Sequence, residues 1–376
     1  MTIQYHDLET YTRNSNFYSE FSILATVKSF DLLAIRKRYL ATKHKKSNRT
    51  GSVERREVAI GGIVQLTIKK GKLVTSTILA KMPEPRGIHV TPGSIALSSE
   101  NRAFIIENET IYTVTDDWLS YIHTVQINEK NPNTILISSS GFDAIFEFNY
   151  KNNQKIYEWF AWENGFNAGF DPATGNKIYL TRLPEIHKQH IEDKIQHLYI
   201  SDPKTQTLPT ARRAAFINSV VYSNKPETLL ATFFHEGAVF EIEKSTGKAT
   251  RVLDKLKNPH GGQNFHDKFM ATSTAQGELV IGDTQLQHRY QISKLSGKPV
   301  ELADMEWIQN SIKLDDNFIC IDSNRNAFII FNPEKRLIDL IPYDSNWAIQ
   351  DITLNVTKEE NVKQIKHIIE NNTINP

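Results

Sequence analysis

ILISSSGFDAIFEFNYKNNQKIYEWF, residues 135–160, is one of three stretches that share a single design; the others are LLATFFHEGAVFEIEKSTGKATRVL (229–253) and FICIDSNRNAFIIFNPEKRLIDLI (318–341). Each contains an apolar run, a tight turn, a second apolar run, a turn rich in Asn, Gly, Lys or Pro, and a third run. Short β-branched and aromatic runs between turn residues are typical of strands. Similar runs dominate residues 21–356, whereas helical periodicity is scarce, so we expect an all-β fold.

A further short strand is expected before such triplets, and its first residues also align. Seven openings of this kind occur: RGIHVT (86–91), SYIHTV (120–125), GFNAGF (165–170), AFINSV (215–220), NPHGGQ (258–263), WIQNSI (307–312) and AIQDIT (348–353). Their aligned polar residues are His89, His123, Asn167, Asn218, His260, Asn310 and Asp351. Four-stranded units that repeat every ~40–50 residues are typical of propeller blades. The spacing predicts a seven-bladed β-propeller, with six blades as the alternative.

The two ends of the chain are expected to complete one blade together. The last opening runs into a polar segment, while the runs that start at residue 21 have no opening strand of their own. Pairing the C-terminal strand with the N-terminal strands removes two exposed sheet edges. We expect an N-terminal extension (1–20), a single propeller domain (21–356) with insertions near 37–59 and 183–197, and a C-terminal tail (357–376).

This periodicity resembles the bacterial β-propeller superfamily that includes gluconolactonase-like, NHL-repeat and virginiamycin-lyase-like proteins. The resemblance covers nearly the whole chain and is architectural. It implies a fold and no particular set of catalytic residues.

Composition narrows the partners and the location. Lys and Arg number 44 against 43 Asp and Glu, so nucleic acid and anionic membranes are not the expected partners. No apolar run reaches the roughly 18 residues of a membrane helix, and no export signal is recognisable at the N-terminus. Cys320 is the single cysteine, which excludes an intrachain disulfide and favours a cytoplasmic protein. Its apolar surroundings predict a buried, inert thiol.

The openings define the candidate site. In a four-stranded blade they emerge on the same face as the turn between the second and third strands, and would encircle one mouth of the central channel. His89, His123 and His260 could be catalytic there, or could bind a divalent metal together with Asp351. The sequence does not distinguish Ca, Mg or Zn. Equally, such polar side chains commonly bond to water and backbone.

Side chains in the equivalent turns complete this site. His235 could transfer protons, because histidine titrates near neutral pH and the neighbouring Glu236 would raise its pKa. An arginine in such a position could bind a carboxylate or phosphate. The residues predicted to contact a substrate are Arg86, Phe142, Trp162, Asn218, Glu236, Asn310 and Arg325. The structural alternative is that aromatics pack between blades and that arginines are simply solvated.

Two insertions interrupt the repeat. The first, near 37–59, is rich in Lys and Arg and is expected to be a solvated loop that could attract an anion. The second, near 183–197, is expected to cover the channel mouth. It contains His187 and His190, which one helical turn could bring together on a metal.

Two functions fit these features. The first is an enzyme acting on a small polar or aromatic molecule at the channel mouth, as a metal-assisted lyase, hydrolase or isomerase. The second is a non-catalytic platform that binds a protein partner. Nucleic-acid binding has the weakest support, because the net charge is near zero. The sequence leaves the oligomeric state open.

Overall fold

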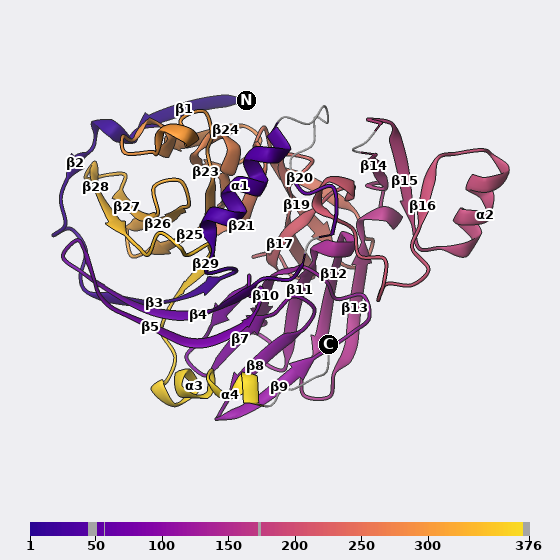
Figure 1. Cartoon of the computed structure of the whole chain (residues 1–376), viewed down its shortest axis with the longest axis horizontal. Coiled ribbons are helices and arrows are strands. Elements are labelled where there is room, and N and C mark those ends of the chain that lie inside the picture. The colour runs from indigo at the N-terminus through magenta and orange to yellow at the C-terminus, as the bar shows by residue number, and fades with distance from the viewer. Residues whose placement is uncertain (44–50, 56, 172–173, 371–376) are drawn as a thin grey trace.

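The structure, a computed structural model, describes residues 1–43, 51–55, 57–171 and 174–370 (Figure 1). In these residues 29 strands form seven sheets of three to five strands, an all-β arrangement consistent with a β-propeller. Within the same ranges, no helix is both long and apolar enough to cross a membrane.

Six sheets begin with an innermost strand and continue outward in antiparallel order. The first contains β6 (Ile88–Val90), β7 (Ser94–Ser98), β8 (Ala103–Glu107) and β9 (Thr110–Val114). The second contains β10 (Ile122–Ile127), β11 (Thr134–Ser139), β12 (Ala144–Asn149) and β13 (Gln154–Phe160). The third contains β17 (Ile217–Tyr222), β18 (Thr228–Phe233), β19 (Ala238–Glu243) and β20 (Ala249–Leu253). The next two contain β21 (Pro259–Phe265), β22 (Lys268–Ser273), β23 (Glu278–Gly282) and β24 (Leu286–Gln291); and β25 (Ile308–Leu314), β26 (Asn317–Asp322), β27 (Ala327–Asn332) and β28 (Leu337–Pro342).

The sixth sheet joins the two ends of the chain. It contains β29 (Ile349–Leu354), β3 (Phe21–Val27), β4 (Ile60–Lys69) and β5 (Lys72–Pro83), in that order. Strand β29 pairs antiparallel with β3, with Ile352 opposite Ala25. Residues more than 300 positions apart therefore share one ladder.

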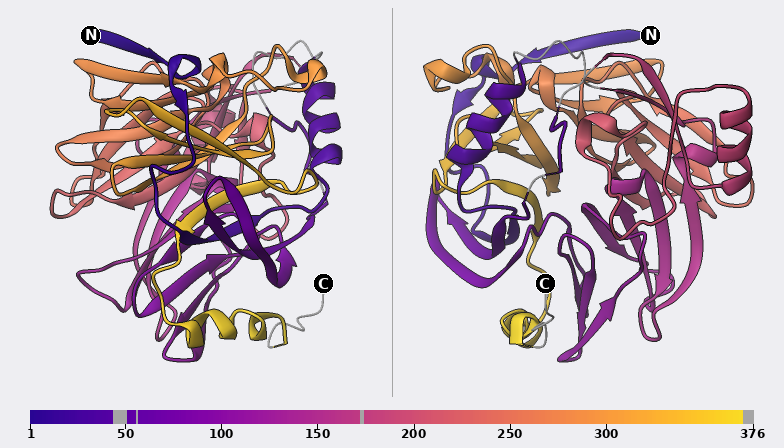
Figure 2. Two further views of the ribbon diagram at one scale, coloured as in Figure 1. Left: turned by 90° about the vertical axis from the view of Figure 1, so that its left-hand side faces the viewer. Right: turned by 45° about the vertical axis from the view of Figure 1, so that its right-hand side comes forward.

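The first residues of the chain add outer strands to two other sheets. Strand β1 (Thr2–Asp7) runs parallel to β24, and β2 (Thr12–Arg13) runs parallel to β28. The chain ends in the short helices α3 (Glu359–Gln364) and α4 (His367–Glu370). Figure 2 shows β1 and these helices at opposite ends of the molecule.

The core lies between the faces of neighbouring sheets. The middle strands of the blades have sequences such as TILISS (β11) and AFIIFN (β27), in which every residue is buried. Side chains on both sides of such a strand can be apolar because each face packs against another sheet. Cys320 in β26 is completely buried, and burial raises its pKa to about 12, which fits an inert thiol.

The seventh sheet differs from the expected ring of seven. It contains β14 (Ala168–Phe170), β15 (Lys177–Thr181) and β16 (His197–Tyr199), and β16 runs parallel to β15. Most of its side chains are only partly buried, so it lacks the two apolar faces that a position between neighbouring blades requires. Instead, β10 contacts β17 directly: the Val220 N–H donates to Thr124 Oγ1 over 2.9 Å. The opening with Asn167 therefore lies outside the inner ring.

Candidate functional site

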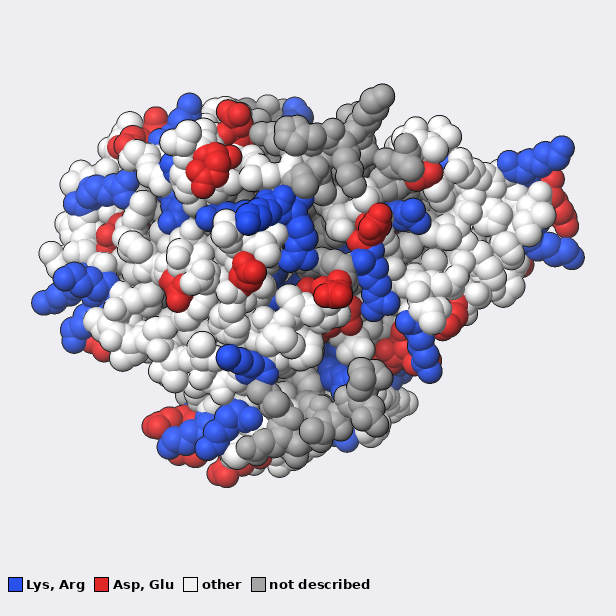
Figure 3. Space-filling view, in the orientation of Figure 1, with Lys and Arg blue, Asp and Glu red and all other residues white. Residues whose placement is uncertain are grey.

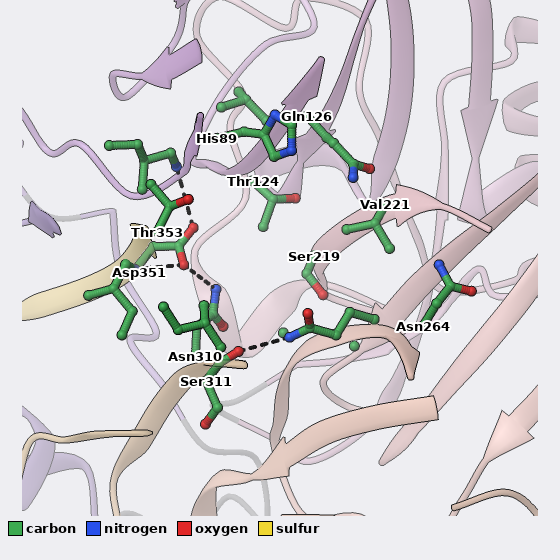
Figure 4. Close-up of a pocket in the computed structure, with 17 residues that line it drawn as sticks. His89, Thr124, Gln126, Ser219, Val221, Asn264, Asn310, Ser311, Asp351 and Thr353 are labelled. Carbon is green, nitrogen blue, oxygen red and sulfur yellow. Dashed lines mark hydrogen bonds between the residues drawn. The ribbon is translucent and has the colours of Figure 1, made fainter. Parts of the chain in front are cut away.

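A cavity of about 340 Å³ lies where the innermost strands β6, β10, β17, β21, β25 and β29 meet. This volume is at the lower end of the range found for small-molecule sites. Figure 4 shows the side chains around this cavity: His89 and Gln126 lie on one side, Asn310 and Asp351 on another, and Ser219 on a third. The cavity therefore lies among these six strands, and each of them contributes to its wall.

Side-chain hydrogen bonds connect these six strands in order. Strand β6 is bonded to β10 through His89 Nδ1 and the Ile127 N–H (3.3 Å), and β10 to β17 through Gln126 Oε1 and the Tyr222 N–H (2.7 Å). Innermost strands have a free edge, and these bonds satisfy backbone groups that would otherwise be buried without a partner.

The same belt of bonds continues around the other half of the channel. Asn218 Nδ2 in β17 donates to the Pro259 carbonyl of β21 over 2.7 Å, and Gln263 Nε2 in β21 donates to the Ser311 carbonyl of β25 over 2.8 Å. Asn310 Nδ2 in β25 then donates to Asp351 Oδ1 in β29 over 2.9 Å. Several polar residues of the openings thus have a structural role.

Asp351 closes this belt of hydrogen bonds. Among the described lining residues it is also the one with a carboxyl group. Its Oδ1 accepts bonds from Asn310 and from the Ile352 N–H (2.9 Å), and its Oδ2 accepts the Ile88 N–H of β6 (3.3 Å). Burial raises its pKa from 3.8 to about 7, although these donors act in the opposite direction. Asp351 can therefore both give and take a proton near neutral pH.

His89 lines the same cavity in its neutral form. Burial lowers its pKa to about 4. Because its Nδ1 accepts the Ile127 N–H, the ring proton lies on Nε2, which can donate a hydrogen bond. His89 is therefore a hydrogen-bond donor to a ligand rather than a base at neutral pH.

Three amide groups of the lining keep part of their bonding capacity. Gln126 uses its oxygen and Gln263 its nitrogen in the belt, which leaves Gln126 Nε2 as a donor and Gln263 Oε1 as an acceptor. Asn310 likewise keeps Oδ1. Among the described lining residues there is no Lys or Arg. The cavity offers a mixture of donors and acceptors without a permanent positive charge.

His123 and His260 lie one residue before the lining of their strands. The Tyr121 carbonyl accepts from His123 Nδ1 over 2.9 Å, and burial, with Arg86 and Arg213 nearby, lowers the pKa of His123 well below 6.5. His260 Nδ1 lies 2.7 Å from Thr274 Oγ1, and burial lowers its pKa to about 3. Both are neutral at pH 7.

The four predicted metal ligands are not gathered at one point. His89 and Asp351 line the cavity, whereas His123 and His260 bond outside the lining. In the described part of the chain, no group of three or more His, Cys, Asp or Glu side chains is placed to hold a metal ion. The donor set at the cavity therefore does not fit the expected metal.

Other predicted residues have partners at the face of the openings or between blades. His235 Nε2 lies 3.0 Å from the Thr210 carbonyl, and Glu236 pairs with Arg251 over 3.1 Å. Arg325 pairs with Asp322 over 2.6 Å. These three lie in turns and do not line the cavity.

The aromatic and remaining basic candidates are buried. Phe142 packs edge to face on Trp118, with ring centroids 5.0 Å apart, and Trp162 Nε1 donates to Asp143 over 3.1 Å. Arg86 is ion-paired with Glu84 and lies over the Tyr121 ring. They support packing around the channel, and the lining does not include them.

The first insertion lies over the face of the openings. Its helix α1 (Leu32–Lys43) is held there by Arg36, whose Nη2 donates to the Ser323 carbonyl (2.5 Å) and to Asn326 Oδ1 (2.7 Å) in the β26–β27 turn. Figure 3 shows Lys and Arg gathered near the middle of this face. Residues 44–50 and 56 of the insertion lie outside the described residues.

The second insertion does not cover the channel. Its helix α2 (Pro184–Glu192) lies at the outer edge of the molecule, beside β15 and β16 (Figure 1). The expectation of a lid over the mouth is therefore not met, because the sheet that carries the insertion stands outside the inner ring.

Gln126 and Gln263 line the cavity but were not among the predicted site residues. Three predicted residues, His123, Asn218 and His260, each lie one residue before the lining. The strands β10, β17 and β21, which carry these residues, each contain a β-bulge or similar irregularity close to the opening. Strands β25 and β29 contain one as well, and there Asn310 and Asp351 line the cavity. A bulge adds a residue and changes which side chain points inward. Gln263 is the last residue of the opening NPHGGQ, and its polar side chain was the one sign in the sequence that it could line the site.

Comparison with known proteins supports the fold. No protein-family model and no curated protein matches the sequence. Solved structures similar to this chain include the nidogen/laminin complex (TM-score 0.52, 10% identity, covering 89% of this chain and 98% of that one). A protein of unknown function from Bacteroides caccae is similar to the same extent (TM-score 0.51, 11% identity, 89% and 99%).

Virginiamycin B lyase from Staphylococcus aureus is a more distant match (TM-score 0.40, 13% identity, covering 69% of this chain and 84% of that one). At 10–11% identity, the first two structures show a likeness of fold and favour neither an enzyme nor an interaction protein. The matches to the first two structures, which cover 89% of this chain, therefore concern its fold alone.

Proposed function

We propose that the chain is a six-bladed β-propeller that binds a small, uncharged polar molecule in its central cavity and transfers a proton through Asp351. The observation that carries this proposal is a buried carboxyl group, Asp351, in a cavity lined by polar side chains; burial raises its pKa to about 7. Perturbed titratable groups in cavities are common at functional sites.

The arrangement of the innermost strands supports the proposed count of six blades. Six strands line the cavity and are bonded to one another in a closed order, which ends with Asp351 of β29 bonded to Ile88 of β6. On this proposal the β14–β16 sheet is an addition between two blades. The pairing of β29 with β3 then closes the propeller.

An uncharged ligand agrees best with the groups that remain. His89 Nε2 and Gln126 Nε2 are donors, while Gln263 Oε1 and Asn310 Oδ1 are acceptors. An anion would meet no Lys or Arg among the described lining residues. Hydroxyl or amide groups of a ligand would satisfy such a mixed set, and a protonated Asp351 would add a further donor.

The proposed chemistry is general acid–base catalysis. Asp351 would take a proton from the ligand or donate one to it, and His89 would orient a ligand oxygen through its Nε2 proton. Such a reaction would be of the lyase, isomerase or hydrolase type.

A cavity-filling variant tests the location. Val221 lines the cavity and Val252 lies on outer strand β20, yet both are half-buried and pack against the same core cluster. Neutral polyols and amides are screened by ligand-observed NMR. We expect compounds that bind the wild-type protein and Val252→Phe but not Val221→Phe. Binding that survives Val221→Phe, or no binder in the screen, would contradict the proposal.

A further inference from the structure

Three histidines outside the cavity gather where α2 packs on β16. His187 and His190 are on α2, and His197 begins β16. His187 Nδ1 lies 2.7 Å from His197 Nε2, and the ring centroids of His190 and His197 are 5.0 Å apart. All three side chains are half-buried, so their rings are close together yet accessible to solvent.

The protonation of His197 is fixed by the backbone. Its Nδ1 lies 2.8 Å from the Ile195 carbonyl, and since a carbonyl can only accept, Nδ1 carries the proton. Its Nε2 therefore presents a lone pair toward His187. Histidines that ligate metals are commonly oriented in this way by a carbonyl on the opposite ring nitrogen.

His190 has an unsatisfied nitrogen beside this pair. Its Nδ1 is buried and has no hydrogen-bond partner among the described residues. Burial and the neighbouring His197 lower the pKa of His190, while Asp193 at the end of α2 acts in the opposite direction. A buried polar atom without a partner is costly, and a bound cation would satisfy it.

We infer that His187, His190 and His197 form a binding site for one divalent transition-metal ion of the zinc type. Three imidazoles, completed by Asp193 or by water, are ligands that Zn²⁺, Ni²⁺ and Cu²⁺ accept, whereas Ca²⁺ and Mg²⁺ prefer oxygen. The site is separate from the channel and independent of the proposed reaction.

A small movement is required before the ion can bind. The described arrangement does not itself place three ligands for a metal. Two nitrogens of one tetrahedral zinc lie about 3.3 Å apart. His187 Nδ1 and His197 Nε2 share a hydrogen bond and are 2.7 Å apart. Rotation of the half-buried His187 ring, which stacks on Tyr199 with ring centroids 4.2 Å apart, would open this gap. The single proton of the neutral ring would then be carried by Nε2, which leaves the Nδ1 lone pair for the metal.

The consequence of binding is a fixed α2. The helix has no fully buried residue of its own, and its contacts with the neighbouring strands include the stacking of His187 on Tyr199 of β16. A metal ligated from both elements would join them, as structural zinc sites do in small domains.

The test uses the full chain without an affinity tag, after treatment with EDTA. Zn²⁺ is titrated in competition with a chromophoric chelator, and Co²⁺ absorption reports tetrahedral coordination. We expect one ion per chain and an affinity at least tenfold lower in His190→Gln and His197→Asn. His288→Ala is the matched control, because His6 and His288 form the other close histidine pair, at 3.1 Å, without a third imidazole among the described residues. It should bind zinc as the wild type does.

The proposal is overturned if the wild type takes up no stoichiometric zinc, or if all three variants bind alike. A variant that loses the α2 fold would also lose binding, so the wild type is tested alone as well. Zinc should shift the NMR signals of three histidine rings and slow proteolysis within residues 183–197. Unshifted rings would overturn the proposal whatever the variants do.

Discussion

Replacing Asp351 with Asn is expected to change how the stability of the protein depends on pH. Burial raises the pKa of this carboxyl from 3.8 to about 7 in the folded chain. The folded protein therefore holds the proton more tightly than the unfolded protein does, and protonation favours folding. This stabilisation is complete below pH 3.8 and is lost as the pH rises through 7.

The size of the effect follows from the shift in pKa. A shift of about three units corresponds to ~4 kcal/mol, at about 1.4 kcal/mol for each unit. Since Asn does not titrate, the free energy of unfolding of the wild type should fall by up to this amount relative to Asp351→Asn. Burial lowers the pKa of His89 and His260, which acts in the opposite direction, but equally in both proteins.

Urea unfolding at pH values from about 4 to about 8, followed by circular dichroism and tryptophan fluorescence, measures this difference. Asp283→Asn is the control. Its hydrogen bond with Lys268 lowers the pKa of Asp283 from 3.8 to about 2, so its titration lies mostly below this range and its difference should be flat above about pH 5. If the free energy of unfolding of the wild type stays constant or rises with pH relative to that of Asp351→Asn, the expected pKa shift is contradicted.

Three further outcomes concern the fold. Deleting residues 348–376 removes β29 and leaves β3 without its partner, so the shortened chain should show no cooperative unfolding transition by circular dichroism. Deleting residues 1–20 removes only outer strands and should do no more than lower the melting temperature. Cys320 should react with a thiol reagent only after unfolding, because it is completely buried; rapid reaction of the native protein would contradict its placement. Phe146→Ala should cost ~3–5 kcal/mol in urea unfolding, since this ring is completely buried, and the exposed Ile156→Ala should cost less than about 1 kcal/mol.

Much of the fold could be predicted from the sequence. The triplets around residues 135–160, 229–253 and 318–341 each fold as three neighbouring strands of one sheet, because apolar runs and turn residues act locally. The incomplete repeat at residue 351 correctly pointed to a strand whose partner lies at the N-terminus. Asn167 was aligned on local similarity alone, and its place outside the ring depends on partly exposed strands that no local pattern reveals.

The site was harder to predict than the fold. His89, Asn310 and Asp351 were predicted for the site and line the cavity, whereas His123 and His260 lie one residue before the lining. Bulges in the innermost strands are set by tertiary packing, so an alignment of openings cannot show which side chain faces inward. The belt of hydrogen bonds also depends on contacts between strands about 40 residues apart or more.

The titration of Asp351 itself is the decisive measurement for the proposed proton transfer. Carbon-13 NMR of a chain labelled at aspartate carboxyl carbons, with the signal assigned by its loss in Asp351→Asn, gives the pKa of this group without any known ligand. We expect the Asp351 signal to titrate with a pKa of about 7. A pKa at or below the ordinary 3.8 would contradict it, because the carboxyl would then be ionised throughout the neutral range and could not donate a proton to a ligand.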